Sequence, residues 1–200
     1  MIELLRDSEY ADITVEQVIQ RADVARATFY SHYADKDELF CDVVAELTSD
    51  LIARASAVAP IGSRVYAGAA VYALFRHAQT YPSVYLAMLH GAAGGAAIHD
   101  FRAALQVAYQ GLVEAQQKAL GAEERMPLDF IVQSWVGEHL ALIGWWLEDE
   151  PPYSAADLTR MRLQLMMHGP LWARGISPEE MTFDEAQFDQ LVAEDEAVAT

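Results

Sequence analysis

Apolar residues recur at helical spacing along most of the chain. The clearest example lies near the start, where four apolar residues fall at positions i, i+3, i+4 and i+7: Val15, Val18, Ile19 and Ala22. This spacing lines one face of a helix. Thr14 precedes the run and Gln17 follows Thr14 by three residues, a capping-box pattern that marks where a helix begins. A helix is therefore predicted over 14–22.

Start and stop signals divide the rest of the chain into further helices. Polar caps and prolines precede the apolar stripes, and glycines or prolines follow them. Helices are predicted over 25–32, 35–57, 63–81, 82–90, 96–120, 127–148, 154–173 and from 177 onward. No segment shows the alternation of β-branched residues that is typical of a strand. The fold class is therefore predicted to be all-α, with about nine or ten helices.

Composition places the chain among globular proteins. It has 200 residues, of which 53% are hydrophobic and 22% charged, so it can bury a substantial core. A single cysteine, Cys41, excludes an internal disulfide framework and suits a reducing compartment. The longest apolar run, 140–147, is far shorter than a membrane span, and the start MIELLRDSEY has no basic region of a signal peptide. We therefore expect a cytoplasmic protein without a membrane segment.

The formal net charge is −17, and the acidic residues are unevenly distributed. Residues 177–200 contain eight acidic side chains and no Lys or Arg, so removing them would change the net charge to −9. Residues 1–50 contain four basic and twelve acidic side chains. An acidic surface repels a polyanion, so nucleic-acid binding near the start would depend on local geometry rather than on overall charge.

The predicted helices 14–22 and 25–32, joined by a sharp turn, have the arrangement of a helix-turn-helix unit. In such units the second helix enters the DNA major groove and the first crosses the backbone. Four apolar residues are expected to pack the two helices together: Val18, Ile19, Val24 and Phe29. The alternative is a plain helical hairpin with a polar surface, and periodicity alone does not separate the two.

The second helix carries side chains that suit DNA contacts. Arg26 can pair with guanine or a phosphate, and Thr28 can contact a phosphate or a thymine methyl group. Tyr30 and His32 are phosphate hydrogen-bond donors, and Lys36 lies in the first turn of the next helix, where free N–H groups favour an anion. The predicted DNA-binding residues are Thr14, Arg26, Ala27, Thr28, Tyr30, Ser31, His32 and Lys36.

The segment ITVEQVIQRADVARATFYSHYADKDELF resembles the DNA-binding domain of the TetR/AcrR family of bacterial transcriptional repressors. The family pattern reads roughly T-x-x-x-I-A-x-x-A-G-V-S-x-x-T-x-Y-x-x-F-x-x-K-x-x-L. The chain matches the pattern at Thr14, Val18, Ile19, Ala22, Val24, Thr28, Phe29, Tyr30, Tyr33, Lys36 and Leu39. The resemblance implies a three-helix DNA-binding head over 1–45 and a larger helical bundle, for ligand binding and dimerisation, over 46–200.

The chain departs from that pattern in three places. Asp23 replaces the turn glycine, and Asp tolerates a left-handed backbone better than most residues. Ala25 replaces the usual Ser and removes a helix cap that is worth about 1 kcal/mol. Residues 1–10 resemble only the last two turns of the family's first helix, so we hypothesise that ten or more preceding residues are missing from this chain. We therefore expect weak DNA binding by the 200-residue form.

The resemblance also implies partners. A homodimer would place two heads on a palindromic double-stranded operator, and a small-molecule effector of unidentified structure would release the repressor from it. The alternative is a helical small-molecule-binding or interaction protein of the same fold that has weak or lost DNA recognition, which the charge deficit favours. A third hypothesis is an enzyme whose active site lies in the helical bundle.

Aromatic and methionine side chains in the bundle suggest an effector pocket between helices. For any single residue ordinary helix-bundle core is the commoner role, and the candidates are Tyr72, Phe75, Tyr85, Met88, Phe101, Tyr109, Trp135, Glu138 and His139. An inward Glu138 would favour a cationic or hydrogen-bonding effector, although an exposed glutamate is the commoner arrangement.

The two helices 127–148 and 154–173 are the expected dimer interface, because the first is apolar on two faces and must be covered twice. The predicted contacts are Ile131, Leu140, Ile143, Leu147, Met161, Leu165, His168 and Trp172.

Other chemistries have little support in the sequence. The six histidines lack the spacing of a metal site, and there is neither a nucleophile elbow nor a phosphate-binding glycine loop after a strand. We therefore expect no cofactor, no bound metal and no catalytic residues.

Overall fold

A computed structural model describes residues 1–58, 68–121 and 123–173 of the chain. It divides into two compact units, Met1–Thr159 and Arg160–Thr200, each of which is treated separately below. The described residues contain eight α-helices, three short 3-10 helices and no strand, which confirms the predicted all-α class. None of these helices is both long and apolar enough to cross a membrane. The helix predicted from 177 and the start predicted at 63 lie outside the described residues.

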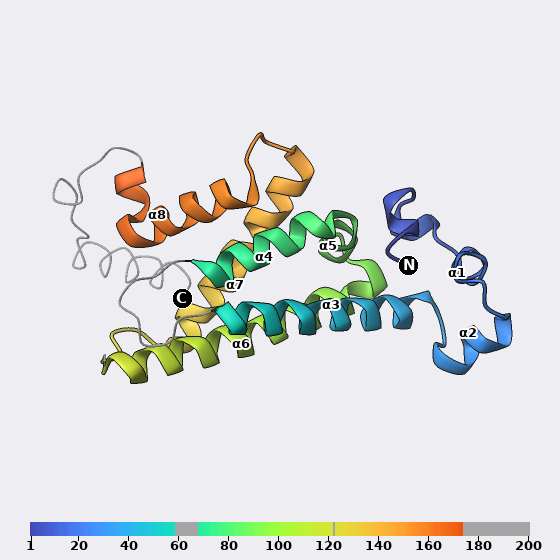
Figure 1. Cartoon of the computed structure of the whole chain (residues 1–200), viewed down its shortest axis with the longest axis horizontal. Helices are drawn as coiled ribbons and strands as arrows, with labels where there is room; N and C mark the ends of the chain where they lie inside the picture. The colour runs from blue at the N-terminus through green and yellow to red at the C-terminus, as the bar shows by residue number, and fades with distance from the viewer. Residues whose placement is uncertain (59–67, 122, 174–200) are drawn as a thin grey trace, which may run out of the picture. The chain divides into compact units, whose positions relative to one another are not determined.

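The amino-terminal head consists of short elements. They are η1 (Leu4–Arg6), η2 (Tyr10–Asp12), α1 (Val15–Ala22) and α2 (Arg26–His32), as Figure 1 shows in blue. The expected end of a first α-helix over 1–10 is a 3-10 turn instead, because Arg6 and Asp7 donate to carbonyls three residues earlier. Leu4 and Leu5 of this turn are buried, so it still contributes to the apolar core.

The bundle is built from longer helices. They are α3 (Lys36–Val58), α4 (Ala69–Thr80), α5 (Pro82–Leu89), η3 (Ala92–Gly95), α6 (Ala96–Leu120), α7 (Leu128–Asp149) and α8 (Ala155–Ala173). Within the first unit α3 packs against α4 and α6, α6 packs against α7, and α5 packs against α7. The helix α8 starts in the first unit and continues into the second, where a non-helical backbone at Gly169 interrupts it.

The predicted caps form real hydrogen bonds. The backbone N–H of Thr14 donates to Gln17 Oε1 over 2.7 Å, and the backbone N–H of Gln17 donates to Thr14 Oγ1 over 3.3 Å. Asp35 Oδ1 accepts two backbone N–H groups at the start of α3, each over 2.9 Å. These bonds satisfy backbone N–H groups that have no partner within the first turn of a helix. Short polar motifs therefore predicted where these helices begin.

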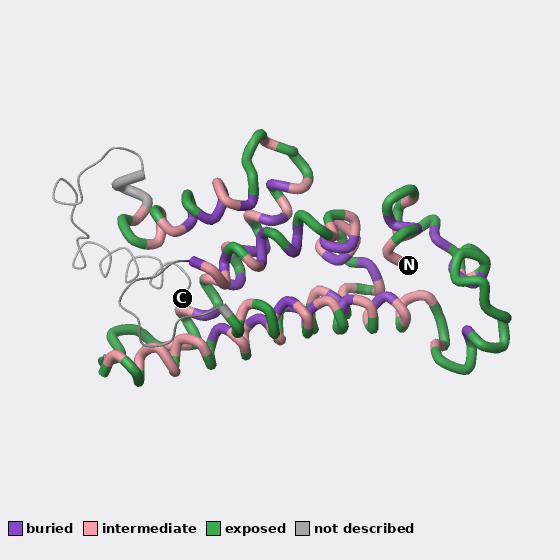
Figure 2. Tube along the Cα trace, in the orientation of Figure 1, coloured by how far each residue is buried: buried purple, intermediate pink, exposed green. Residues whose placement is uncertain are grey.

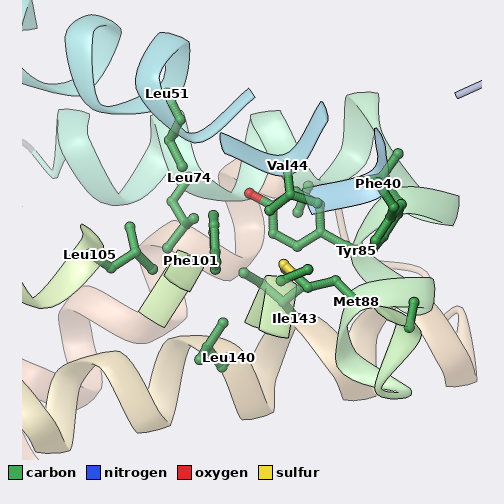
Figure 3. Close-up of a cluster of buried hydrophobic side chains, with 14 of the residues drawn as sticks. Phe40, Val44, Leu51, Leu74, Tyr85, Met88, Phe101, Leu105, Leu140 and Ile143 are labelled. Atoms are coloured by element: carbon green, nitrogen blue, oxygen red, sulfur yellow. The ribbon is translucent and has the colours of Figure 1, made fainter. Parts of the chain in front are cut away.

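Buried apolar side chains from α3, α4, α5, α6 and α7 form one continuous core (Figure 3). Its fully buried members include Phe40, Leu74, Phe75, Tyr85, Met88 and Ile143. Phe40 also packs against Tyr10 of the head, with the rings tilted and their centroids 4.8 Å apart. The long helix α3 therefore contributes to the bundle core and to the attachment of the head.

Candidate nucleic-acid interface

The turn between α1 and α2 depends on one left-handed residue. Asp23 has φ 53° and ψ 48°, and its backbone N–H donates to the carbonyl of Gln20 over 3.3 Å. The next N–H, of Val24, donates to the carbonyl of Ile19 over 3.2 Å, which completes the bonding pattern of a Schellman motif. The structure confirms that Asp23 takes the conformation that the family pattern assigns to glycine.

The start of α2 lacks a side-chain cap, as predicted. Ala25 is the N-cap residue and makes no side-chain hydrogen bond. Its backbone carbonyl accepts the N–H groups of Thr28, over 2.9 Å, and Phe29, over 3.2 Å. The first turn of α2 is thus stabilised by backbone bonds alone.

A single aromatic side chain anchors α2. Phe29 is 5% exposed and contacts Tyr33, with ring centroids 5.8 Å apart. Val18 and Ile19 of α1 are buried as predicted. The prediction for Val24 was wrong: it is 38% exposed, because it lies in the turn rather than on the inner face of either helix. A short helix held by one anchor leaves most of its surface open.

The side chains predicted to read DNA are accessible. Six of the eight predicted residues share α2 and are all exposed: Arg26, Ala27, Thr28, Tyr30, Ser31 and His32. The Arg26 guanidinium lies 5.5 Å from the centre of the Tyr30 ring, a cation–π contact. Arg26 Nη1 also lies 3.3 Å from Glu16 Oε2, so an acidic side chain of α1 contacts the principal cation of α2.

Thr14 is exposed, but its hydroxyl already takes part in the capping box. It accepts the N–H of Gln17 and lies 3.0 Å from Gln17 Oε1. A DNA contact through this hydroxyl would therefore compete with the cap.

Lys36 is placed differently from the prediction. Its ammonium donates to three backbone carbonyls, those of Tyr10 over 2.9 Å, Ala11 over 3.2 Å and Ile13 over 2.9 Å. The same nitrogen lies 4.6 Å from the centre of the Tyr10 ring. Because an ammonium has three donors, this arrangement occupies all of them inside the protein. Lys36 therefore holds the segment 10–13 against the start of α3 instead of presenting a free charge to a phosphate.

Tyr10 completes this attachment. Its hydroxyl donates to Asp37 Oδ1, in the first turn of α3. Burial, together with the hydrogen bond to Asp37 and its negative charge, raises the pKa of Tyr10 above its ordinary value. No local sequence pattern predicts this cluster, since backbone carbonyls that converge on one point are a property of the folded turn.

The predicted effector residues differ in how far they are buried. Phe75, Tyr85, Met88, Phe101, Tyr109 and His139 are buried, Trp135 and Glu138 are half-buried, and Tyr72 is 42% exposed. A cavity of about 50 Å³ lies between α3, α4 and α6. It is lined by Leu51, Ile52, Ala55, Ser56, Ala70, Leu74, Leu105, Ala108, Tyr109 and Leu112. Of the predicted residues, its wall includes Tyr109.

The bundle core also contains a buried polar pair. His77 Nδ1 lies 2.9 Å from the hydroxyl of Tyr85, and both side chains are buried. Burial lowers the pKa of His77, whereas the nearby Asp50 raises it and Arg54 lowers it by smaller amounts. Burial also raises the pKa of Tyr85. A neutral histidine hydrogen-bonded to a neutral phenol is therefore the form present at neutral pH.

Two of the four predicted dimer contacts on α7 are buried in the core of the single chain. Leu140 is 4% exposed and Ile143 is fully buried, so these two residues cannot form an interface; Ile131 and Leu147 are half-buried. On α8 Met161 and His168 are exposed, Leu165 is half-buried, and the side chain of Trp172 lies outside the described residues. The exposed residues of α7 include a different, uncharged stripe: Phe130, Ser134, Gly137, Ala141 and Trp145. The sequence pattern predicts two apolar faces on α7, but it does not show which face packs against the core of the same chain.

Comparison with known proteins agrees with the head geometry. Residues 2–43 match the family model described as bacterial regulatory proteins, tetR family. A curated Bacillus subtilis (strain 168) protein, the uncharacterized HTH-type transcriptional regulator YxbF, is 35% identical over 49 residues. That match spans 24% of this chain and 13% of the curated relative, so it covers only a small part of the relative's length.

Two solved structures share the fold over most of the chain. A putative TetR-family transcriptional regulator from Syntrophomonas wolfei str. Goettingen gives a TM-score of 0.70 at 14% identity, covering 83% of this chain and 88% of that one. A bacterial regulatory protein in the tetR family from Rhodococcus RHA1 gives 0.60 at 15% identity, covering 84% and 91%. Residues 2–43 are therefore similar to the tetR family model, and the fold over most of the chain is similar to that of these two solved regulators.

Proposed function

We propose that the chain is a DNA-binding transcriptional regulator that reads its operator with α2. The observation that carries this proposal is the accessibility of six of the seven residues of α2, all except Phe29. A helix attached by one inward aromatic can enter the major groove with little steric obstruction. The sequence match over 2–43 supports the same assignment.

The roles of the side chains follow from their chemistry. Arg26 pairs with guanine, while Thr28 contacts a phosphate or a thymine methyl group. Tyr30, Ser31 and His32 donate to phosphates, and Ala27 is small enough to allow the helix to approach the bases. Lys36 contributes indirectly, because it fixes the segment before α1 on the start of α3.

A homodimer would present two such heads to a palindromic operator. The uncharged exposed stripe of α7 supports this assembly, since Phe130 is 63% and Trp145 is 40% exposed. Large aromatic side chains are enriched at interfaces between subunits. The head over 1–45 and the remaining residues, 46–200, act in this proposal as reader and as sensing and dimerisation domain.

The effector would bind in the bundle and release the repressor. The cavity between α3, α4 and α6 is apolar apart from the hydroxyls of Ser56 and Tyr109, which favours a small, uncharged compound. Its volume of about 50 Å³ is well below that of a typical ligand site, so binding must enlarge it by moving α3, α4 or α6. Because α3 begins at the head, such a movement would change the head position, and only a ligand with different affinities for the two positions can shift the equilibrium.

The competing function is a helical binding protein that has lost DNA recognition. It is favoured by the head's composition, since residues 1–45 contain four basic and ten acidic side chains. The two functions differ in whether the purified chain selects a DNA sequence.

Selection of bound fragments from a random duplex library at about 50 mM salt, where phosphate contacts are strong, separates the two functions. A regulator enriches a palindromic sequence, and Arg26→Ala with Tyr30→Phe weakens binding to it by one to two orders of magnitude. A matched control is Arg54→Ala, which removes an exposed cation of α3 that is paired with Asp50 at 2.7 Å, away from α2. Enrichment of no sequence would favour the competing function.

A further inference from the structure

The cation on α2 is held from two sides. Arg26 Nη1 lies 3.3 Å from Glu16 Oε2, and Arg26 Nη2 lies 3.5 Å from the hydroxyl of Tyr30. The other carboxylate oxygen of Glu16 accepts from Gln20 Nε2 over 3.5 Å. Glu16 is thus positioned between its own helix and the DNA-reading helix.

This contact does little for folding. The side chains of Arg26 and Glu16 are 68% and 57% exposed, and ion pairs as exposed as this one stabilise a protein by about 0–1 kcal/mol. Phe29, Val18 and Ile19, not the ion pair, join α1 to α2. The pair can therefore open without unfolding the head.

The contact has a larger effect on the free energy of DNA binding than on folding. A phosphate or a guanine must displace the Glu16 carboxylate to use Arg26, and the displaced carboxylate then stays within a few ångströms of a polyanion. Repulsion over that range is only partly screened at physiological salt, where the screening length is about 8 Å. Every DNA sequence therefore meets the same cost at Glu16.

The benefit that offsets this cost differs between sequences. A bidentate arginine–guanine contact contributes about 1–3 kcal/mol of discrimination, while non-specific binding gains one phosphate contact of a kind that many sites supply. Because breaking the pair costs the same in each case, Glu16 lowers the affinity for both kinds of site by a similar factor.

We propose that Glu16 is an inhibitory residue whose carboxylate competes with DNA for Arg26 and so lowers the affinity of the head for every duplex. The proposal rests on the proposed function, because it assumes that α2 faces DNA. It assigns a role to part of the acidity of the head, since the carboxylate that contacts Arg26 weakens DNA binding.

The test uses Glu16→Gln, which keeps the shape of the side chain and its bond to Gln20 while removing the charge. Glu3→Gln is the matched control, because Glu3 pairs with Arg21 at the same distance of 3.3 Å on the same head. Binding to a scrambled duplex is followed by fluorescence anisotropy between about 50 and 200 mM salt. We expect Glu16→Gln to bind the scrambled duplex about three- to tenfold more tightly than the parent, and Glu3→Gln to change it by less than about twofold.

Two further measurements make the result specific. In an Arg26→Ala background the gain from Glu16→Gln falls to that of Glu3→Gln, since the carboxylate no longer has a cation to compete for. On the selected operator the gain matches that on the scrambled duplex within about twofold, because the same ion pair is broken in both complexes. The proposal is overturned by equal gains for the two glutamate variants, by a gain that persists without Arg26, or by a gain on only one of the two duplexes.

Failure of the proposed function gives a different pattern. If the parent enriches no sequence, the regulator assignment fails, while the comparison of Glu16→Gln with Glu3→Gln on the scrambled duplex still decides whether the carboxylate blocks Arg26. Absence of any binding by Glu16→Gln at the lowest salt overturns the competition as well.

Discussion

The head and the bundle of the first unit are stabilised in different ways. In the bundle, fully buried side chains such as Phe75 and Ile143 form a continuous apolar core. In the head, exposed residues dominate α1 and α2, as the green segments of Figure 2 show, and polar bonds fix the geometry. The capping box at Thr14 and the three carbonyls around Lys36 are the main examples.

The two regions therefore differ in which substitutions they can accept without losing stability. A packed core loses stability with every removed methylene group, since the surroundings close only partly around the cavity. A head held by a few polar bonds loses little from most surface changes but depends strongly on its key contacts. The head can therefore vary its reading surface while the bundle keeps its shape.

The largest expected effect is in the bundle. Phe75→Ala should destabilise the chain by about 3–5 kcal/mol, because Phe75 is fully buried and its ring packs edge-to-face against Trp146 with centroids 6.2 Å apart. Urea denaturation followed by circular dichroism measures the loss. Tyr72→Ala on the same helix, where the side chain is 42% exposed, is the control and should cost less than about 1 kcal/mol. Equal losses would mean that the bundle core is not where the structure places it.

The next largest effect is in the head. Lys36→Met should cost about 1–3 kcal/mol, since it removes three hydrogen bonds from one charged donor. Hydrogen exchange of residues 10–14 should rise, and Arg21→Met, which breaks only an exposed pair, should leave it nearly unchanged. If Lys36 were a phosphate contact instead, Lys36→Met would keep stability and lower the salt dependence of DNA binding by about one ion.

A smaller, pH-dependent effect distinguishes the two regions by their ionisable groups. The pKa of His77 is lowered in the folded bundle, so below the ordinary histidine pKa of about 6.5 the unfolded chain binds more protons than the folded one. His77 therefore makes the free energy of unfolding fall as the pH drops from about 7 to 5. His77→Gln keeps a partner for Tyr85 and should flatten this part of the profile.

The control for that profile is His32→Gln, which replaces an exposed histidine of the head and leaves the bundle core intact. Thermal melts at pH 5, 6 and 7 provide the measurement. A profile for His77→Gln that runs parallel to that of the parent would show that the buried histidine is not the source of the pH dependence.

Local signals made most helices and the reading surface predictable. Capping boxes, prolines and glycines act within a few residues, so the starts of α1, α3 and α8 matched the sequence. Asp23 was predictable for the same reason, because a sharp helix-to-helix turn requires a left-handed residue. The exposure of Arg26 and Tyr30 followed from the single inward position of Phe29.

Contacts between distant residues were not predictable. Lys36 meets carbonyls 23 to 26 residues away, and no local pattern records where those carbonyls converge. Leu140 and Ile143 belong to an apolar face that suits a core as well as a partner, and only the packing of neighbouring helices decides between them. The cavity between α3, α4 and α6 depends on how these three helices pack together, which the hydrophobic periodicity of the sequence does not predict.

The smallest expected effect restores the missing cap of α2. Ala25→Ser places a hydroxyl where the backbone is already extended, at φ −68° and ψ 147°, as an N-cap requires. It should stabilise the head by about 0.5–1 kcal/mol, seen as slower hydrogen exchange of residues 26–32, with no change in the bundle. Ala27→Ser, two residues later on the same helix, adds the same hydroxyl without a cap and should give no gain. Because the cap acts before DNA is bound, Ala25→Ser should tighten operator binding only slightly. A large change in affinity would mean that α2 is partly unfolded in the free head. Folding of α2, rather than displacement of Glu16, would then limit DNA binding.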